Sequence, residues 1–488
     1  MTASAARLPA DRAPGLALGV IGLGLLAIAS GIGIALGELQ ALVAALSVIG
    51  CLAVLSDFRI GAVLMIIMLP IEGSYLFPHS AFGVTGLNPL NMVLGATFVS
   101  YLIRGQELRR FLPKPLLLLY IVPVVLAALI GSRHVDEIYP YFYEVEVIHF
   151  TDAFGYLRDV AVKPLFMVLA ALLIGAAVAK SKKSESFLTP LIVSVWAMSL
   201  MAIGYVLVSG LSLGALALTS SRAFFSGLGM HANDLGRLYA VAYALLLFTW
   251  GETKDVRLKT VLFMTMGVLT LALLFTFSRG AFVGWVMVNV LFLFWKFNAR
   301  TAGLALLAGG IGLLFMPGAV VSRMSLGLVG GGNVNEVSAG RIEEIWIPLL
   351  PEILRSPPWG NGLDSTMWAQ ALWAETMLPV THPHNAYIQA ILDMGLIGLA
   401  LLLAFYWHVY RQMRDLGSNA YLSPTMRGFY QGAVAGLACF ILTGFAGSSL
   451  RATPEFAFLW IAIGMMYGQL ARKPDRPQAA ERPRRTTA

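Results

Sequence analysis

A His-Asn pair, His384-Asn385, follows Pro383 and opens a long apolar segment. Proline suits the first turn of a helix, where its missing N–H would have no partner, and Thr381 or His382 can cap that turn. His384 is therefore expected in the first helical turn, where the helix dipole disfavours an imidazolium. A neutral imidazole can accept a proton from a hydroxyl. The pattern predicts a general base or a group that orients an acceptor hydroxyl.

Two glycines, Gly395 and Gly398, follow on the same predicted helix. At ~100° per residue both return to within about 40° of the direction of His384. Small residues at this spacing let a neighbouring helix approach closely. The spacing predicts a helix-packing face behind the site and a histidine that points into a bundle. A capping histidine above an ordinary packing stripe explains the same residues, and both interpretations stay open at this point.

Arginines form the second candidate group. They are Arg222, Arg237, Arg279 and Arg341. A charged group at a membrane edge is costly unless it is paired or solvated, and a guanidinium can hold two phosphate oxygens at once. Several arginines near one histidine predict a site for an anionic substrate. Each arginine taken singly could instead snorkel or pair with a local carboxylate.

Two further segments carry side chains of interest. Residues 341–354 place apolar side chains at helical spacing, which predicts an amphipathic interfacial helix that Pro348 and Pro351 should bend or break. Residues 133–161 are rich in aromatic and acidic side chains. Their rings could stack on sugars or form an interfacial belt, and both readings remain open.

The composition indicates which kind of structure positions these residues. The chain has 488 residues, of which 58% are hydrophobic and 12% charged, and its mean hydropathy is +0.76. About 20 apolar residues cross a bilayer as a helix, and the chain offers many such runs. The net charge of +8 is a topology signal rather than a sign of nucleic-acid binding. Cys51 and Cys439 lie in apolar runs and suggest no metal site.

These runs predict an all-α integral membrane protein, a polytopic bundle of about 12–14 transmembrane helices. The expected spans are 15–36, 38–56, 60–77, 88–104, 115–132, 162–180, 187–208, 235–250, 259–277, 280–296, 301–318, 386–408, 426–446 and 454–470. Residues 1–470 are expected to form one transmembrane domain, and 471–488 a basic, disordered tail.

Lysines and arginines gather in alternate loops, which by the positive-inside rule places both termini in the cytoplasm. The longer loops on the other side are 133–161, 209–234 and 319–385. Long loops are often functional, and the last of these is expected to hold short amphipathic helices. The chain carries no phosphate-binding loop of the ATPase type and no zinc-ligand spacing, so neither a cofactor nor a metal is expected.

With these motifs in place, the chain resembles the O-antigen ligase and O-antigen polymerase superfamily of bacterial envelope enzymes. The resemblance covers roughly residues 220–410, and Asp393 stands where the family often has glutamate. The motifs are His384-Asn385 with Gly395-x-x-Gly398, Asn233-Asp234-Leu235, Ser278-Arg279-Gly280, Gly340-Arg341 with Trp346, and Pro358-Trp359-Gly360-Asn361-Gly362.

The resemblance implies a GT-C-like membrane glycosyltransferase in the bacterial inner membrane with its site facing the periplasm. The donor would be a glycan on undecaprenyl diphosphate, and the acceptor another glycan or the lipid A-core. His384 would take the hydroxyl proton or orient the acceptor. Arg279 and Arg222 would stabilise the leaving phosphate, with Arg341 and Arg237 as further diphosphate ligands. Membrane lipids and other envelope-polysaccharide assembly proteins are the expected partners.

Polymerase and ligase remain alternatives within this family. The span count and the modest outer loop slightly favour a polymerase of O-antigen or exopolysaccharide. A lipid-linked glycan transporter or flippase is the alternative from another class. Transporters place polar groups at mid-membrane, whereas the arginines and His384 are expected at one surface.

Overall fold

The computed structural model describes residues 39–72, 80–81, 84–86, 88–104, 111–210, 212, 215, 225, 228–296, 303, 318, 335, 338, 340–370 and 380–472. Arg222, the expected span 15–36, most of 301–318 and the tail from residue 473 lie outside these ranges.

The described chain is built from helices, as expected. The long helices are α2 (Leu39–Ser56), α3 (Phe58–Met68), α4 (Pro89–Ile103), α6 (Val122–Gly131), α9 (Lys163–Lys180), α10 (Leu188–Ser209), α12 (Ala232–Glu252), α13 (Val256–Phe275), α14 (Arg279–Trp295), α20 (Ala386–Ser418), α21 (Pro424–Thr443) and α22 (Ala457–Ala471). The shorter helices are α5 (Lys114–Leu116), α7 (Tyr141–Glu144), α8 (Ala153–Leu157) and α18 (Ile347–Arg355), and strands β1 (Ser80–Ala81) and β2 (Val84–Thr85) form one small hairpin.

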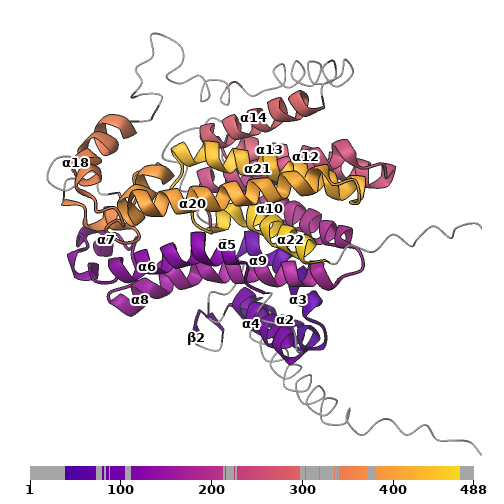
Figure 1. Cartoon of the computed structure of the whole chain (residues 1–488), viewed down its shortest axis with the longest axis horizontal. Helices are drawn as coiled ribbons and strands as arrows, with labels where there is room; N and C mark the ends of the chain where they lie inside the picture. The colour runs from indigo at the N-terminus through magenta and orange to yellow at the C-terminus, as the bar shows by residue number, and fades with distance from the viewer. Residues whose placement is uncertain are drawn as a thin grey trace, which may run out of the picture.

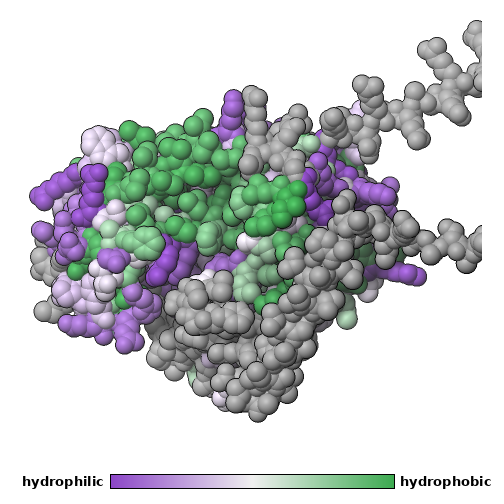
Figure 2. Space-filling model, turned by 90° about the horizontal axis from the view of Figure 1, so that it is seen from below, coloured by the Kyte–Doolittle hydropathy of each residue, from purple (hydrophilic) through white to green (hydrophobic). Residues whose placement is uncertain are grey.

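Within the described residues, six helical segments are long and apolar enough to cross a membrane. They are Lys114–Gly131, Ala153–Lys180, Ser184–Ser209, Val256–Phe275, Ala386–Ser418 and Pro424–Ala446. Shorter apolar helices accompany them, and the long helices run side by side along the long axis of the molecule (Figure 1). One face shows an apolar band between two polar ends (Figure 2). The protein is therefore an all-α, multi-pass membrane protein.

Helix α12 is the centre of the bundle and packs against α13, α14 and α21. Glycines on α21 make the closest of these contacts possible: a Cβ added at Gly428 would lie 2.5 Å from the Phe248 carbonyl oxygen, and one at Gly432 2.6 Å from that of Ala244. Between α9 and α22, Gly464 has the same role against Ala171. Backbone contact of this kind stabilises helix pairs where lipid offers no hydrophobic driving force.

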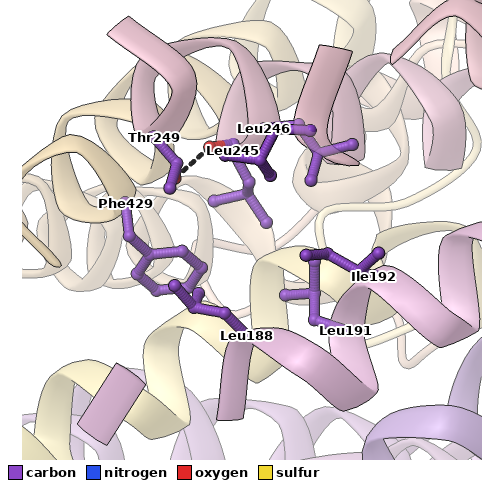
Figure 3. Close-up of a pocket in the computed structure, with 8 residues that line it drawn as sticks. Leu188, Leu191, Ile192, Leu245, Leu246, Thr249 and Phe429 are labelled. Atoms are coloured by element: carbon purple, nitrogen blue, oxygen red, sulfur yellow. Dashed lines mark hydrogen bonds between the residues drawn. The ribbon is translucent and has the colours of Figure 1, made fainter. Parts of the chain in front are cut away.

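The core between α10, α12, α13 and α21 is nearly filled. A small pocket of about 10 Å³ lies there, lined by Leu188, Leu191, Ile192, Leu245, Leu246, Thr249, Leu262 and Phe429 (Figure 3). The Thr249 hydroxyl donates to the Leu245 carbonyl at 2.6 Å, so it does not present an unpaired polar group to the void. An apolar void of this size stays dry.

Candidate active site

Three helices begin at the same end of the bundle, where α21 ends. The start of α12 packs closely against the start of α14, because a Cβ on Gly236 would lie 2.7 Å from the Cβ of Ala281. The start of α20 is tied to the end of α21 by a 2.6 Å hydrogen bond from the Tyr387 hydroxyl to the Ile441 carbonyl. Helix N-termini carry partial positive charge and unpaired N–H groups, so their convergence favours an anion.

Asn385, not His382 or Thr381, caps α20. Its Oδ1 accepts hydrogen bonds from the backbone N–H groups of Tyr387 at 3.0 Å and Ile388 at 3.2 Å. His384 therefore lies just before the helix, with φ of 52°, and the expectation that it occupies the first helical turn was wrong. The Asn side chain is among the strongest N-caps, so the helix begins at Ala386, two residues after the histidine.

Contacts on both sides hold the His384 segment. The Trp346 indole N–H donates to the Pro383 carbonyl at 2.8 Å. The His384 N–H donates to Nδ1 of His382 at 3.3 Å, and the two imidazole rings meet edge to face with their centroids 4.2 Å apart. The imidazole of His384 is thus presented by a fixed backbone rather than by a mobile loop end.

Burial and nearby positive charge keep both imidazoles neutral. Burial, together with the charges of Arg237 and Arg341, lowers the pKa of His382 to about 4. The pKa of His384 is held far below its ordinary value by burial, by His382 and by Arg341 and Arg237. The predicted neutral imidazole is therefore supported, although burial and the arginines act here in place of the expected first-turn dipole.

Three of the four predicted arginines lie in one electrostatic neighbourhood. Burial and the charges of Arg237 and Arg279 lower the pKa of Arg341 to about 10. Arg279 is the first residue of α14 and is half-buried. The same charges reach His231, the N-cap of α12, whose pKa is lowered mainly by burial. The cluster of Arg237, Arg279, Arg341 and the three histidines is called the basic site below.

The guanidinium of Arg237 is held by two structural partners. It is 4% exposed, pairs with Asp234 at 2.9 Å and donates to the Ala446 carbonyl at 2.5 Å. Arg237 therefore joins α12 to the end of α21 and contributes its charge from behind the site. Arg341 and Arg279 are both more exposed than Arg237.

The segment that carries Arg341 is the predicted amphipathic helix. A π-helical turn at Ile342–Trp346 runs directly into α18. Ile345 and Leu349 are buried against Ala369 and Leu392, whereas the outer face exposes Ile347, Leu350 and Leu354. The prolines do not end this helix. Pro348 falls in the first turn of α18, where it needs no N–H, and Pro351 lies inside α18.

The prediction that Gly395 forms part of a helix-packing stripe behind His384 was wrong, whereas the same prediction for Gly398 stays a prediction. Gly395 has φ of 66° and ψ of −175°, which breaks α20 into two helices. The Pro358–Gly362 loop enters at the break: Asn361 N–H donates to the Leu392 carbonyl at 2.8 Å, and Ile397 N–H donates to the Pro358 carbonyl at 3.0 Å. A Cβ on Gly395 would lie 2.1 Å from the Pro358 oxygen. The absence of a side chain at Gly395 thus allows close contact with a loop rather than with a neighbouring helix.

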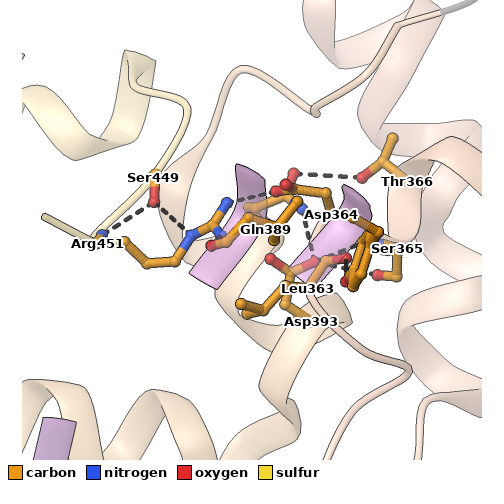
Figure 4. A network of polar contacts seen from close by, with 10 residues as sticks. Leu363, Asp364, Ser365, Thr366, Gln389, Asp393, Ser449 and Arg451 are labelled. Atoms are coloured by element: carbon orange, nitrogen blue, oxygen red, sulfur yellow. Dashed lines mark hydrogen bonds and ion pairs between the residues drawn. The ribbon is translucent and has the colours of Figure 1, made fainter. Parts of the chain in front are cut away.

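A buried polar network next to this break was missed by sequence reasoning. Arg451 forms an ion pair with Asp364 and donates to the Val160 carbonyl at 3.1 Å (Figure 4). The Asp393 carboxylate accepts from Gln389 at 2.6 Å and from the Ser365 N–H at 3.1 Å. The network joins α20 to the 363–366 turn and to the segment before α22. The signal available in the sequence was Arg451 in a short connection between two apolar helices.

The aromatic segment 133–161 packs onto the same part of the fold. The Tyr156 hydroxyl donates to the Leu363 carbonyl at 2.5 Å, and the His134 ring stacks on Trp368 with centroids 5.5 Å apart. Phe142 and Tyr156 are buried, whereas Phe154 is 79% exposed. Some of the rings expected to contact sugar or the interface are therefore core residues.

Comparison with known proteins supports the family resemblance. Residues 261–403 match the model of the O-Antigen ligase family, a stretch that contains Arg279, Arg341 and His384. Over this stretch the multi-pass membrane protein is therefore similar to the O-antigen ligase family. A protein of Rickettsia bellii (strain RML369-C) named "Putative polysaccharide ligase" is 26% identical over 170 residues, which cover 33% of this chain and 41% of that relative.

Proposed function

We propose that the protein transfers or polymerises glycan from an undecaprenyl-diphosphate-linked donor at the periplasmic face of the bacterial inner membrane. The observation that carries the proposal is the basic site: arginine charges, three helix N-termini and a neutral imidazole gather at one end of the bundle. A diphosphate complements this positive charge. The family match to residues 261–403 supports the reaction class.

In the proposed reaction the acceptor hydroxyl attacks the anomeric carbon of the donor sugar. The new glycosidic C–O bond forms as the bond from that carbon to the diphosphate oxygen breaks, and the diphosphate leaves with the electron pair. The hydroxyl proton passes to the imidazole of His384, which is free to accept it because the ring is neutral. Arg279 and Arg341 stabilise the negative charge that develops on the leaving diphosphate.

Arg222 keeps its predicted role as a diphosphate ligand only as a proposal from the sequence, because it lies outside the described residues. Both chain termini are proposed to be cytoplasmic. This places the basic site, at the ends where α12, α14 and α20 begin, on the periplasmic side.

Replacing Arg341 by glutamine is expected to raise the KM for lipid-linked donor about 10- to 100-fold, because hydrogen bonds to charged groups are worth about 1.5–3 kcal/mol. The measurement is steady-state transfer with purified protein. The matched control is Arg355→Gln, which removes an exposed arginine at the far end of the same helix. Equal donor KM in both variants would remove Arg341 from the site.

Acid should destabilise the folded protein through its buried imidazoles. The pKa of His382 is about 4 in the folded protein and about 6.5 in an unfolded chain, so the unfolded chain binds the proton first. The contribution of the neutral imidazole to the free energy of unfolding is complete above pH 6.5 and is lost as the pH falls toward 4. The thermal midpoint in detergent should fall between pH 7 and pH 4.5, and should fall less in a His382→Asn, His384→Asn double variant. An equal fall in the thermal midpoint of the wild type and the double variant would contradict the conclusion that these imidazoles are neutral in the folded protein.

Polymerase and ligase activities leave different products in cells that lack the protein. A lipid A-core bearing a single repeat unit indicates a missing polymerase, which is the favoured form of the proposal. Long chains stranded on the carrier lipid indicate a missing ligase. A purified protein that moves lipid-linked glycan across vesicles without forming glycosidic bonds would instead support a transporter.

A further inference from the structure

A second cavity lies at the other end of the bundle. Its volume is about 250 Å³, and it opens between the ends of α14 and α20 and the first half of α21. It is lined by Trp295, Lys296, Arg414, Gly417, Ser418, Gln431 and Val434. We propose that this cavity binds the phosphate headgroup of an anionic phospholipid.

The cavity is separate from the basic site. Helix α14 begins at Arg279 in the basic site and ends at Trp295 in the cavity, which at 1.5 Å per residue separates the two by roughly 25 Å. That is close to the thickness of a bilayer core. The two sites therefore belong to opposite leaflets.

The charges around the cavity favour an anion. Glu252 faces Lys296 and also lies 3.9 Å from Arg427, so one carboxylate is shared by two cations. Arg414 lines the cavity and is exposed, and the neighbouring Asp415 on α20 does not line it. The Gln431 side-chain amide donates to the Gly417 carbonyl at 2.9 Å and forms part of the cavity wall.

Exposed aromatic side chains on the face of α20 that carries Arg414 favour a lipid over a soluble phosphate as the ligand. Trp407, Tyr410 and Arg414 recur at helical spacing on one face of α20, and the Trp407 and Tyr410 rings stack with centroids 5.1 Å apart. Trp407 is 62% exposed and Phe294 83% exposed. Acyl chains can lie along this aromatic face with the phosphate at Arg414, as in other basic pockets between membrane helices.

Lipid retention measured by native mass spectrometry tests the proposal. The full chain is purified with mixed phosphatidylglycerol and phosphatidylcholine, and we expect selective retention of phosphatidylglycerol. Arg414→Gln should lower that retention at least about 10-fold. Arg411→Gln, which removes an exposed arginine one turn earlier on the same helix and outside the cavity, should retain phosphatidylglycerol like the wild type.

Three results would overturn the proposal. The first is equal retention of the two lipids by the wild-type protein. The second is equal retention of phosphatidylglycerol by the Arg414→Gln and wild-type proteins. The third is displacement of phosphatidylglycerol by glycerol 3-phosphate at a similar concentration. The last would show that the cavity takes a soluble phosphate. The readout does not depend on glycan transfer, so the result is independent of the proposed reaction.

Discussion

The His384→Ala variant is expected to lose glycan transfer by about 10²- to 10⁴-fold, the usual contribution of a positioned acid or base. The loss should appear in kcat with little change in donor KM, because the arginines that hold the diphosphate remain. Transfer from lipid-linked donor, measured with purified protein in detergent or nanodiscs, gives both parameters.

Two controls separate the imidazole from the backbone that carries it. His384 adopts a left-handed conformation with φ of 52°, which asparagine also tolerates well. His384→Asn should therefore fold like the wild type and remain as inactive as the alanine variant. His149→Ala, which removes an exposed histidine in the aromatic segment, should transfer glycan normally. Near-normal turnover by His384→Asn would exclude the imidazole as the proton acceptor.

Gly395→Ala should have the second large effect, on both folding and activity. Only glycine readily adopts φ of 66° with ψ of −175°, and another residue there costs about 1–3 kcal/mol. The added Cβ would also overlap the Pro358 carbonyl and displace the Pro358–Gly362 loop. We expect a lower thermal midpoint and at least about 100-fold slower transfer.

Gly267→Ala is the matched control for this substitution. Gly267 lies within α13, and a Cβ there meets no atom within 4 Å. Alanine is the better helix former by about 1 kcal/mol, so this variant should be as stable as the wild type or slightly more stable. A Gly395→Ala protein that behaves like Gly267→Ala would show that the loop contact is not required.

Simple patterns in the sequence predicted the helices and suggested where the candidate site lies. Apolar length predicts spanning helices because the bilayer leaves the backbone no other partners, and the expected spans from 88–104 to 280–296 all coincide with helices. Arg237, Arg279 and Arg341 were expected to gather because alternate helix ends share one surface. Their mutual effect on pKa is consistent with that expectation.

Local backbone geometry could not be read from spacing. The angular argument that put Gly395 on the face of His384 assumed an unbroken helix, whereas His384 and Gly395 both have positive φ. The Asp364–Arg451 ion pair joins residues 87 positions apart, and no pattern in one sequence records such a pairing. The two structural partners of Arg237, Asp234 and the Ala446 carbonyl, became visible only in three dimensions.

The most direct test is a structure of the protein in nanodiscs with a bound undecaprenyl-diphosphate glycan. The account predicts diphosphate oxygens within hydrogen-bonding distance of the Arg341 or Arg279 guanidinium, and the anomeric carbon next to the imidazole of His384. A diphosphate bound elsewhere, for example at Arg414 on the other side of the bundle, would contradict it.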